Sequence, residues 1–98
     1  MMSIEVEYFG DLSRRQKRAL CEDVIRRTEL RLPDLLRLSD VTYREGRDRV
    51  CVLLPDTSPD DAEIVVSRVR GAMELELLPT KATVSIALSE AGDPSSAA

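Results

Sequence analysis

Four short segments of the chain have the residue pattern of β-strands. Apolar and acidic side chains alternate over residues 3–9, and a period of two is typical of a strand with one exposed face. Residues 41–44 and 50–54 are two further β-rich runs. The charged turn between them contains Gly46, so we predict an antiparallel hairpin. Residues 82–88 read ATVSIAL, a run of β-forming residues that predicts a buried strand.

Two longer segments have apolar residues at helical spacing. The first runs from residue 11 or 13 to about residue 32, where Pro33 ends it or starts a short extra turn. The second begins at Ser58, because the sequence Ser-Pro-Asp-Asp supplies an N-cap, a proline for the first turn and carboxylates that suit the helix dipole. The predicted apolar stripes are Leu20, Val24, Ile25, Thr28 and Leu32 in the first helix, and Ala62, Val65, Val66, Val69 and Met73 in the second.

The predicted elements follow the order β-α-β-β-α-β. This order is typical of a ferredoxin-like α+β sandwich, in which two helices lie on a four-stranded antiparallel sheet. We expect one domain over residues 1–90, followed by a flexible tail of small and polar residues at 91–98.

Composition argues against several classes of function. A net charge of −4, from 14 basic and 18 acidic residues, does not favour nucleic-acid binding. The chain has no histidine, and Cys21 and Cys51 lack metal-site spacing, so no metal, cofactor or His-dependent nucleophile is assigned. No segment has the length of a membrane span and no signal peptide is visible, so we expect no membrane partner. With both cysteines taken as reduced, a cytoplasmic protein is expected.

Residues 37–56 read RLSDVTYREGRDRVCVLLPD. They resemble the signature hairpin of GGDEF-type diguanylate cyclase domains, where an R-x-x-D motif precedes R-x-G-G-D-E-F and a strand ending in Leu-Pro-Asp. Residues 5–9 resemble the family's first strand, D-x-D-x-F, with Glu5 and Glu7 in place of the two aspartates. Residues 84–87 resemble its V-S-I-G strand. The resemblance covers nearly the whole chain but only part of a complete domain, because the family's last helix and strand are missing.

The signature itself is altered. Gly46 and Asp48 are kept, but Arg47 stands where the family has its second glycine and Arg49 where it has glutamate. Ser13 replaces the asparagine that contacts guanine in the family. Cyclisation of GTP requires two divalent metals on hard oxygen ligands and a small backbone close to the nucleotide. The resemblance therefore implies a domain that is not an enzyme.

The R-x-x-D motif is kept at Arg37 and Asp40. In the family this motif, with an arginine on the following helix, forms an inhibitory site for cyclic di-GMP, and Arg68 falls at that helix position. An aspartate accepts from the N1 and N2 edge of guanine, and arginine donates to O6 and N7 or to phosphate. The resemblance thus implies a cyclic di-GMP site at these three residues, with Arg44 and Arg70 as candidate helpers.

Two interpretations remain open. The chain is either a cyclic di-GMP receptor that reports to a partner protein, or a ligand-free interaction or dimerisation module that keeps only the fold. The motif also arises by chance in an arginine-rich chain, since Arg31 and Asp34 form a second instance, and Arg37 and Asp40 would then be an exposed ion pair. General nucleotide binding is disfavoured because no glycine loop that cradles phosphate is present.

The predicted sheet has helices on one face only, so its open face should be lined by alternate strand residues. An extensive apolar face would be covered by a second copy or a partner protein, and we expect a homodimer or obligate partner there. The alternative is a sheet face polar enough to remain exposed to solvent without a partner, which Thr83 and Ser85 favour. The candidate apolar residues are Val50, Val52 and Leu54, or else Cys51 and Leu53, with a share of Val84, Ile86 and Leu88.

Overall fold

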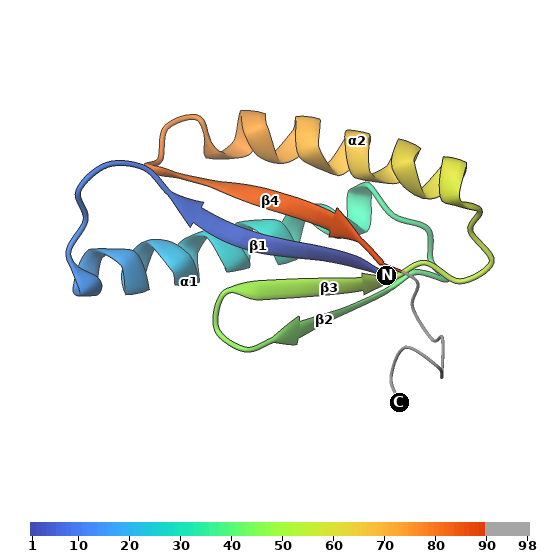
Figure 1. Cartoon of the computed structure of the whole chain (residues 1–98), viewed down its shortest axis with the longest axis horizontal. Coiled ribbons are helices and arrows are strands. Elements are labelled where there is room, and N and C mark those ends of the chain that lie inside the picture. Colours follow the sequence, from blue (N-terminus) through green and yellow to red (C-terminus); the bar gives the residue numbers. More distant parts are fainter. Residues whose placement is uncertain (90–98) are drawn as a thin grey trace.

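The structure is a computed structural model of the 98-residue chain and describes residues 1–89 (Figure 1). The predicted tail at 91–98 lies outside these residues. The elements are β1 (Met2–Tyr8), α1 (Arg14–Arg31), the short 3-10 helix η1 (Leu32–Asp34), β2 (Val41–Glu45), β3 (Arg49–Leu53), α2 (Pro59–Leu77) and β4 (Ala82–Leu88). The predicted order of strands and helices is confirmed.

The strands form one antiparallel sheet in the order β2-β3-β1-β4, with the two helices packed on one face (Figure 1). This is the predicted ferredoxin-like α+β arrangement. β4 is nevertheless an edge strand, and Ala82 is its one buried residue. The prediction of a buried strand at residues 82–88 was wrong, because β-forming residues do not reveal whether a strand is central or at an edge.

The second helix begins after Ser58, as its capping residues predict, and the first begins after Ser13, the later of the two starts that the sequence allowed. The Ser13 hydroxyl accepts from the Gln16 N–H at 3.1 Å, and the Gln16 side chain accepts from the Ser13 N–H at 2.8 Å, which forms a capping box. Ser58 caps α2 by accepting from the Asp61 N–H at 3.1 Å, and Pro59 occupies the first turn. Pro33 lies in η1, so the extra turn predicted after the first helix is confirmed.

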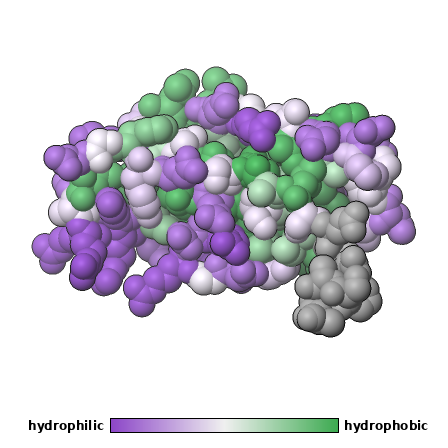
Figure 2. Space-filling model, viewed as in Figure 1, coloured by the Kyte–Doolittle hydropathy of each residue, from purple (hydrophilic) through white to green (hydrophobic). Residues whose placement is uncertain are grey.

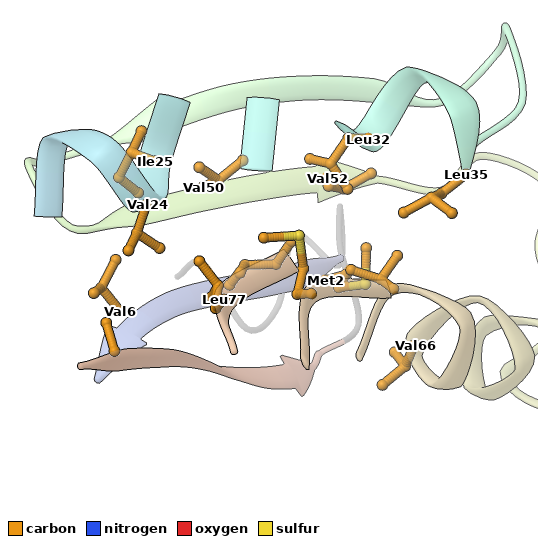
Figure 3. Close-up of a cluster of buried hydrophobic side chains, with 14 of the residues drawn as sticks. Met2, Val6, Val24, Ile25, Leu32, Leu35, Val50, Val52, Val66 and Leu77 are labelled. Carbon is orange, nitrogen blue, oxygen red and sulfur yellow. The ribbon is translucent and has the colours of Figure 1, made fainter. Parts of the chain in front are cut away.

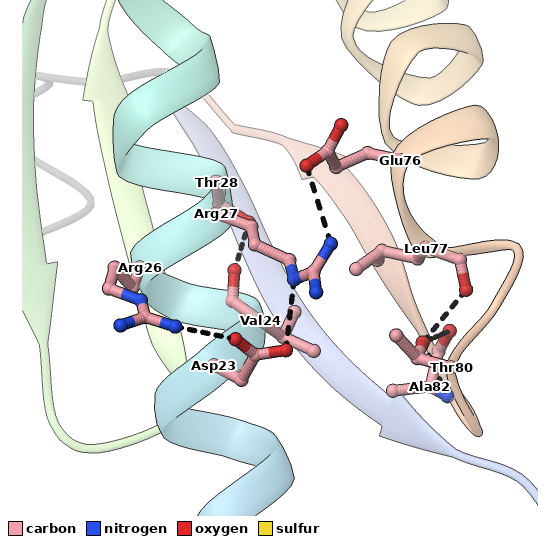
Figure 4. Close-up of polar contacts among 9 residues, drawn as sticks. All are labelled: Asp23, Val24, Arg26, Arg27, Thr28, Glu76, Leu77, Thr80 and Ala82. Atoms are coloured by element: carbon pink, nitrogen blue, oxygen red, sulfur yellow. Dashed lines mark hydrogen bonds and ion pairs between the residues drawn. The ribbon is translucent and has the colours of Figure 1, made fainter.

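An aliphatic core fills the space between the sheet and the helices (Figure 3). Each helix contributes its predicted stripe with small changes, since Cys21 is buried while Leu20 and Val65 are half-buried. Thr28 is the one polar residue in the core of the described chain, and its hydroxyl donates to the Val24 carbonyl at 2.8 Å (Figure 4). The buried strand residues on the helix side are Met2, Ile4, Val6, Val50, Val52 and Ala82.

The open face of the sheet is largely polar. Cross-strand partners point to the same side, so Val84, Ile86 and Leu88 face the helices because they pair with Val6, Ile4 and Met2. Of the two predicted sets, Cys51 and Leu53 lie on the open face, whereas Val50 and Val52 do not. Figure 2, which views this face, shows hydrophilic residues gathered toward the start of α1. The polar residues of the face are Ser3, Glu5, Glu7, Glu45, Arg49, Thr83 and Ser85.

One part of the open face is apolar. Val41, Tyr43 and Leu53 come from β2 and β3 and remain exposed. The expected apolar surface is thus confined to these two strands rather than extending across the sheet. Among the described residues, neither helix is long and apolar enough to cross a membrane.

Candidate functional site

Three segments meet at the corner where Arg37 lies: the loop after η1, the β3–α2 loop and the first half of α2. The Arg37 guanidinium donates to the Pro55 carbonyl at 3.0 Å and also to the Thr57 hydroxyl. These contacts attach the loop before β2 to the loop after β3. The Arg37 side chain stays 54% exposed, so part of its guanidinium is accessible from solvent.

Asp40 is bound to Arg37 by three hydrogen bonds. Its carboxylate accepts from the Arg37 backbone N–H at 2.8 Å and from the guanidinium at 3.2 Å, while its own N–H donates to the Arg37 carbonyl at 3.0 Å. The side chain of Asp40 is 1% exposed. The prediction that this motif is an exposed ion pair was therefore wrong for its carboxylate, because the loop folds around it.

Arg68 reaches the same corner from α2. Its guanidinium lies 3.4 Å from the carbonyl of Leu35, shortly before Arg37 in the chain, and the residue is exposed. The fold thus brings Arg68 of α2 to the loop that carries Arg37 and Asp40.

Arg44 and Arg70 do not join this corner. Arg44 donates two hydrogen bonds to Glu29 of α1, at 3.0 and 2.6 Å, and lies 3.9 Å from Glu22. The hydrogen bond from Arg44 lowers the pKa of Glu29 below its ordinary value. Arg70 is exposed on α2, two positions from Arg68 and hence on a different face of the helix.

In the hairpin that resembles the cyclase signature, the charge of Arg49 is paired with two carboxylates. The Arg49 guanidinium lies 2.6 Å from Glu5 and 3.0 Å from Glu45. The nearby Cys21 thiol donates to the Arg47 carbonyl at 3.2 Å and fixes the turn against α1. Within residues 1–89 no three metal-ligating side chains are grouped as a metal site would require.

A second set of ion pairs connects the helices. Asp23 accepts from Arg26 and from Arg27 at 2.9 Å each, and Arg27 also lies 3.5 Å from Glu76 of α2 (Figure 4). Asp23 has a lowered pKa, chiefly because Arg26 donates to it. These exposed pairs contribute little individually, so we assign them to surface packing.

Sequence reasoning did not identify Pro55 and Thr57 as partners of Arg37. No sequence signal marks a backbone carbonyl as an acceptor for a distant arginine, so this contact emerges only from the folded loops.

The sequence matches no protein-family model. No curated protein matches it as a relative. The case for a function therefore rests on the fold and on the residues described above.

Proposed function

We propose that this chain is a catalytically inactive, GGDEF-like signalling domain that binds cyclic di-GMP at the corner formed by Arg37 and Arg68. The observation that supports the proposal is the convergence of Arg37 and Asp40, from the loop after η1, with Arg68 of α2 at one corner of the surface. Both guanidinium groups are accessible, and arginine suits the paired acceptors of a guanine edge and of phosphate.

Asp40 has a different role in this proposal from the one its motif implies. Its carboxylate is buried and already accepts two hydrogen bonds from Arg37. We assign Asp40 to positioning the Arg37 guanidinium, while Arg37 and Arg68 contact the ligand. The ligand's guanine edges and phosphates would then be held by arginine donors alone.

Calorimetric titration with cyclic di-GMP tests the proposal. Arg37→Ala and Arg68→Ala should each weaken binding by about 1–3 kcal/mol, the range for a lost bidentate base contact. Arg70→Ala is the matched control, because it removes an exposed arginine from another face of the same helix and should leave the affinity unchanged. Absence of binding at millimolar ligand, or equal losses in Arg68→Ala and Arg70→Ala, would refute it.

A second candidate function is a ligand-free interaction or dimerisation module. The satisfied Asp40 carboxylate favours it, since the loop forms its own hydrogen bonds without a ligand. The exposed apolar residues Val41, Tyr43 and Leu53 supply a contact surface on the open face. Light scattering over a dilution series tests this function. Leu53→Lys should dissociate a face-paired dimer, whereas Ile64→Lys, which charges an exposed residue of α2, should not.

A further inference from the structure

The outer edge of β4 is an unprotected strand edge. β4 pairs with β1 on one side, and no strand of residues 1–89 pairs with its other side. Its sequence, ATVSIAL, contains no charge, proline or glycine. Natural proteins usually protect edge strands with such residues, because exposed backbone groups recruit other strands. The opposite edge, β2, has this protection in Arg44 and Glu45.

The hydrogen-bond pattern identifies which backbone groups of β4 are open. Phe9 N–H donates to the Lys81 carbonyl and Ser89 N–H to the Met1 carbonyl, at 2.8 Å each. In an antiparallel ladder the bonded residues alternate, so the odd-numbered residues of β4 bond to β1. The N–H and C=O groups of Val84 and Ile86 therefore point away from the sheet, whereas those of Ala82 are bonded to the Thr80 hydroxyl at 3.2 Å.

α2 lies next to the open edge of β4. It packs against β4 from the helix-covered face of the sheet and runs alongside this strand (Figure 1). Where α2 ends, a depression of about 320 Å³ opens beside the first residues of β4, and Phe9 and Leu78 at its rim are 56% and 73% exposed. The lining residues are Phe9, Glu74, Leu77, Leu78, Thr80, Ala82 and Thr83.

We propose that the outer edge of β4, together with the depression at its start, binds an extended segment of a partner protein as an additional antiparallel strand. The partner's backbone would bond to the open groups of Val84 and Ile86. A large apolar side chain would fill the depression, and a neighbouring lysine or arginine would meet Glu74. Backbone pairing supplies affinity in this mode of recognition and the side-chain pocket supplies specificity.

A second copy of the chain is a poorer occupant of the same strand edge than a single extended segment. Two β4 strands paired edge to edge would lie about 4.8 Å apart. Each would bring its own α2 to the shared seam, because α2 packs against β4, whereas packed helices need about 8–10 Å between their axes. A single extended segment has no such helix, so the geometry selects it as the occupant. This site is separate from the corner of Arg37 and Arg68 and does not depend on the function proposed there.

Binding of a fluorescent peptide, followed by anisotropy, tests the proposal on the full chain. The probe is a capped peptide of alternating valine and threonine with a phenylalanine and a lysine at one end. In antiparallel pairing, residues whose side chains face α2 direct their amides at β4, so the valine amides should bond and the threonine amides should not. N-methylation of the valine amides should weaken binding about tenfold or more, because a lost hydrogen bond costs about 1 kcal/mol and several are lost.

The peptide methylated on its threonine amides is the matched control and should bind like the parent peptide. On the protein side, Val84→Pro removes an open N–H without breaking a bond to β1, whereas Val84→Thr keeps that N–H and should retain binding. Equal binding of the two methylated peptides would show that the peptide binds an apolar surface without backbone pairing, and this would overturn the proposal. No binding at millimolar peptide would also overturn it, as would self-association of the parent chain that Val84→Pro abolishes.

Discussion

The Asp40 carboxylate is folded inside a loop closed by Arg37, which donates to it from the backbone at 2.8 Å and from the guanidinium at 3.2 Å. The chain holds the same motif at Arg31 and Asp34, where the pair lies 3.3 Å apart and the Asp34 side chain is 72% exposed. Two copies of one sequence pattern thus differ in burial, and this difference predicts different costs of mutation.

Asp40→Ala should lower the free energy of unfolding by about 1–3 kcal/mol, because it leaves the Arg37 N–H without its buried acceptor. Asp34→Ala, the matched control, should change it by less than about 0.5 kcal/mol, as expected for an exposed pair. Urea denaturation of the two variants measures both values. Equal effects would show that the loop around Asp40 opens readily in solution.

Incubation with GTP and either magnesium or manganese should yield no cyclic dinucleotide above the protein-free background. This prediction rests on the proposed resemblance to cyclase domains, in which Arg49 takes the place of an acidic metal ligand, and Arg49 is paired with Glu5 at 2.6 Å. Product analysis by chromatography measures the outcome. Protein-dependent product that disappears in Asp48→Ala would contradict this prediction.

The stability of the protein should fall in acid partly through Glu29. Arg44 lowers the pKa of Glu29 in the folded state, so the ionised carboxylate stabilises the fold above its unfolded pKa. That contribution is lost as the pH falls below about 4.3 and through the lower folded value. The free energy of unfolding should fall less over this pH range in Glu29→Gln, whose side chain cannot ionise. If the free energy of unfolding falls equally in the parent chain and in the variant, Arg44 and Glu29 are not paired in solution.

Alkaline conditions should destabilise the protein through Tyr8. Burial, reinforced by a hydrogen bond with Cys21, raises the pKa of Tyr8 from 10.0 to about 12. The folded state therefore disfavours the phenolate, and the stability linked to Tyr8 is lost as the pH rises from 10.0 toward about 12. The phenolate absorbance should titrate late in the native protein and normally in urea. Tyr8→Phe should remove that late-titrating portion, and a normal native titration would contradict the assignment.

Much of the fold was predictable because local residues determine where its elements begin and end. Ser13 and Ser58 cap the helices, Pro33 starts the extra turn, and Gly46 takes a positive φ of 69° in the hairpin. These effects act within a few residues, so a sequence pattern reveals them. The burial of residues 82–88 was predicted wrongly, because the exposure of β4 depends on contacts between distant segments that place it at the sheet edge.

The candidate site was predictable only in part for the same reason. The family resemblance indicated Arg37 and Arg68, and the fold brings them to one corner. The burial of Asp40 depends on how a loop closes, and the partner of Arg44 depends on where the hairpin meets α1. Neither is encoded in residue spacing. Arg70 is a different case, because its distance of two positions from Arg68 on a helix already places it on another face.

The reactivity of the two cysteines can report local opening of the structure. Both thiols are free and buried, Cys21 under the helix layer at 6% exposure and Cys51 within β3 at 0%. A thiol reagent can modify them only when the surrounding structure opens. The two labelling rates would therefore time the detachment of α1 from the sheet separately from the fraying of the β2–β3 hairpin. With no tryptophan in the chain, this pair of reporters would resolve motions that intrinsic fluorescence cannot.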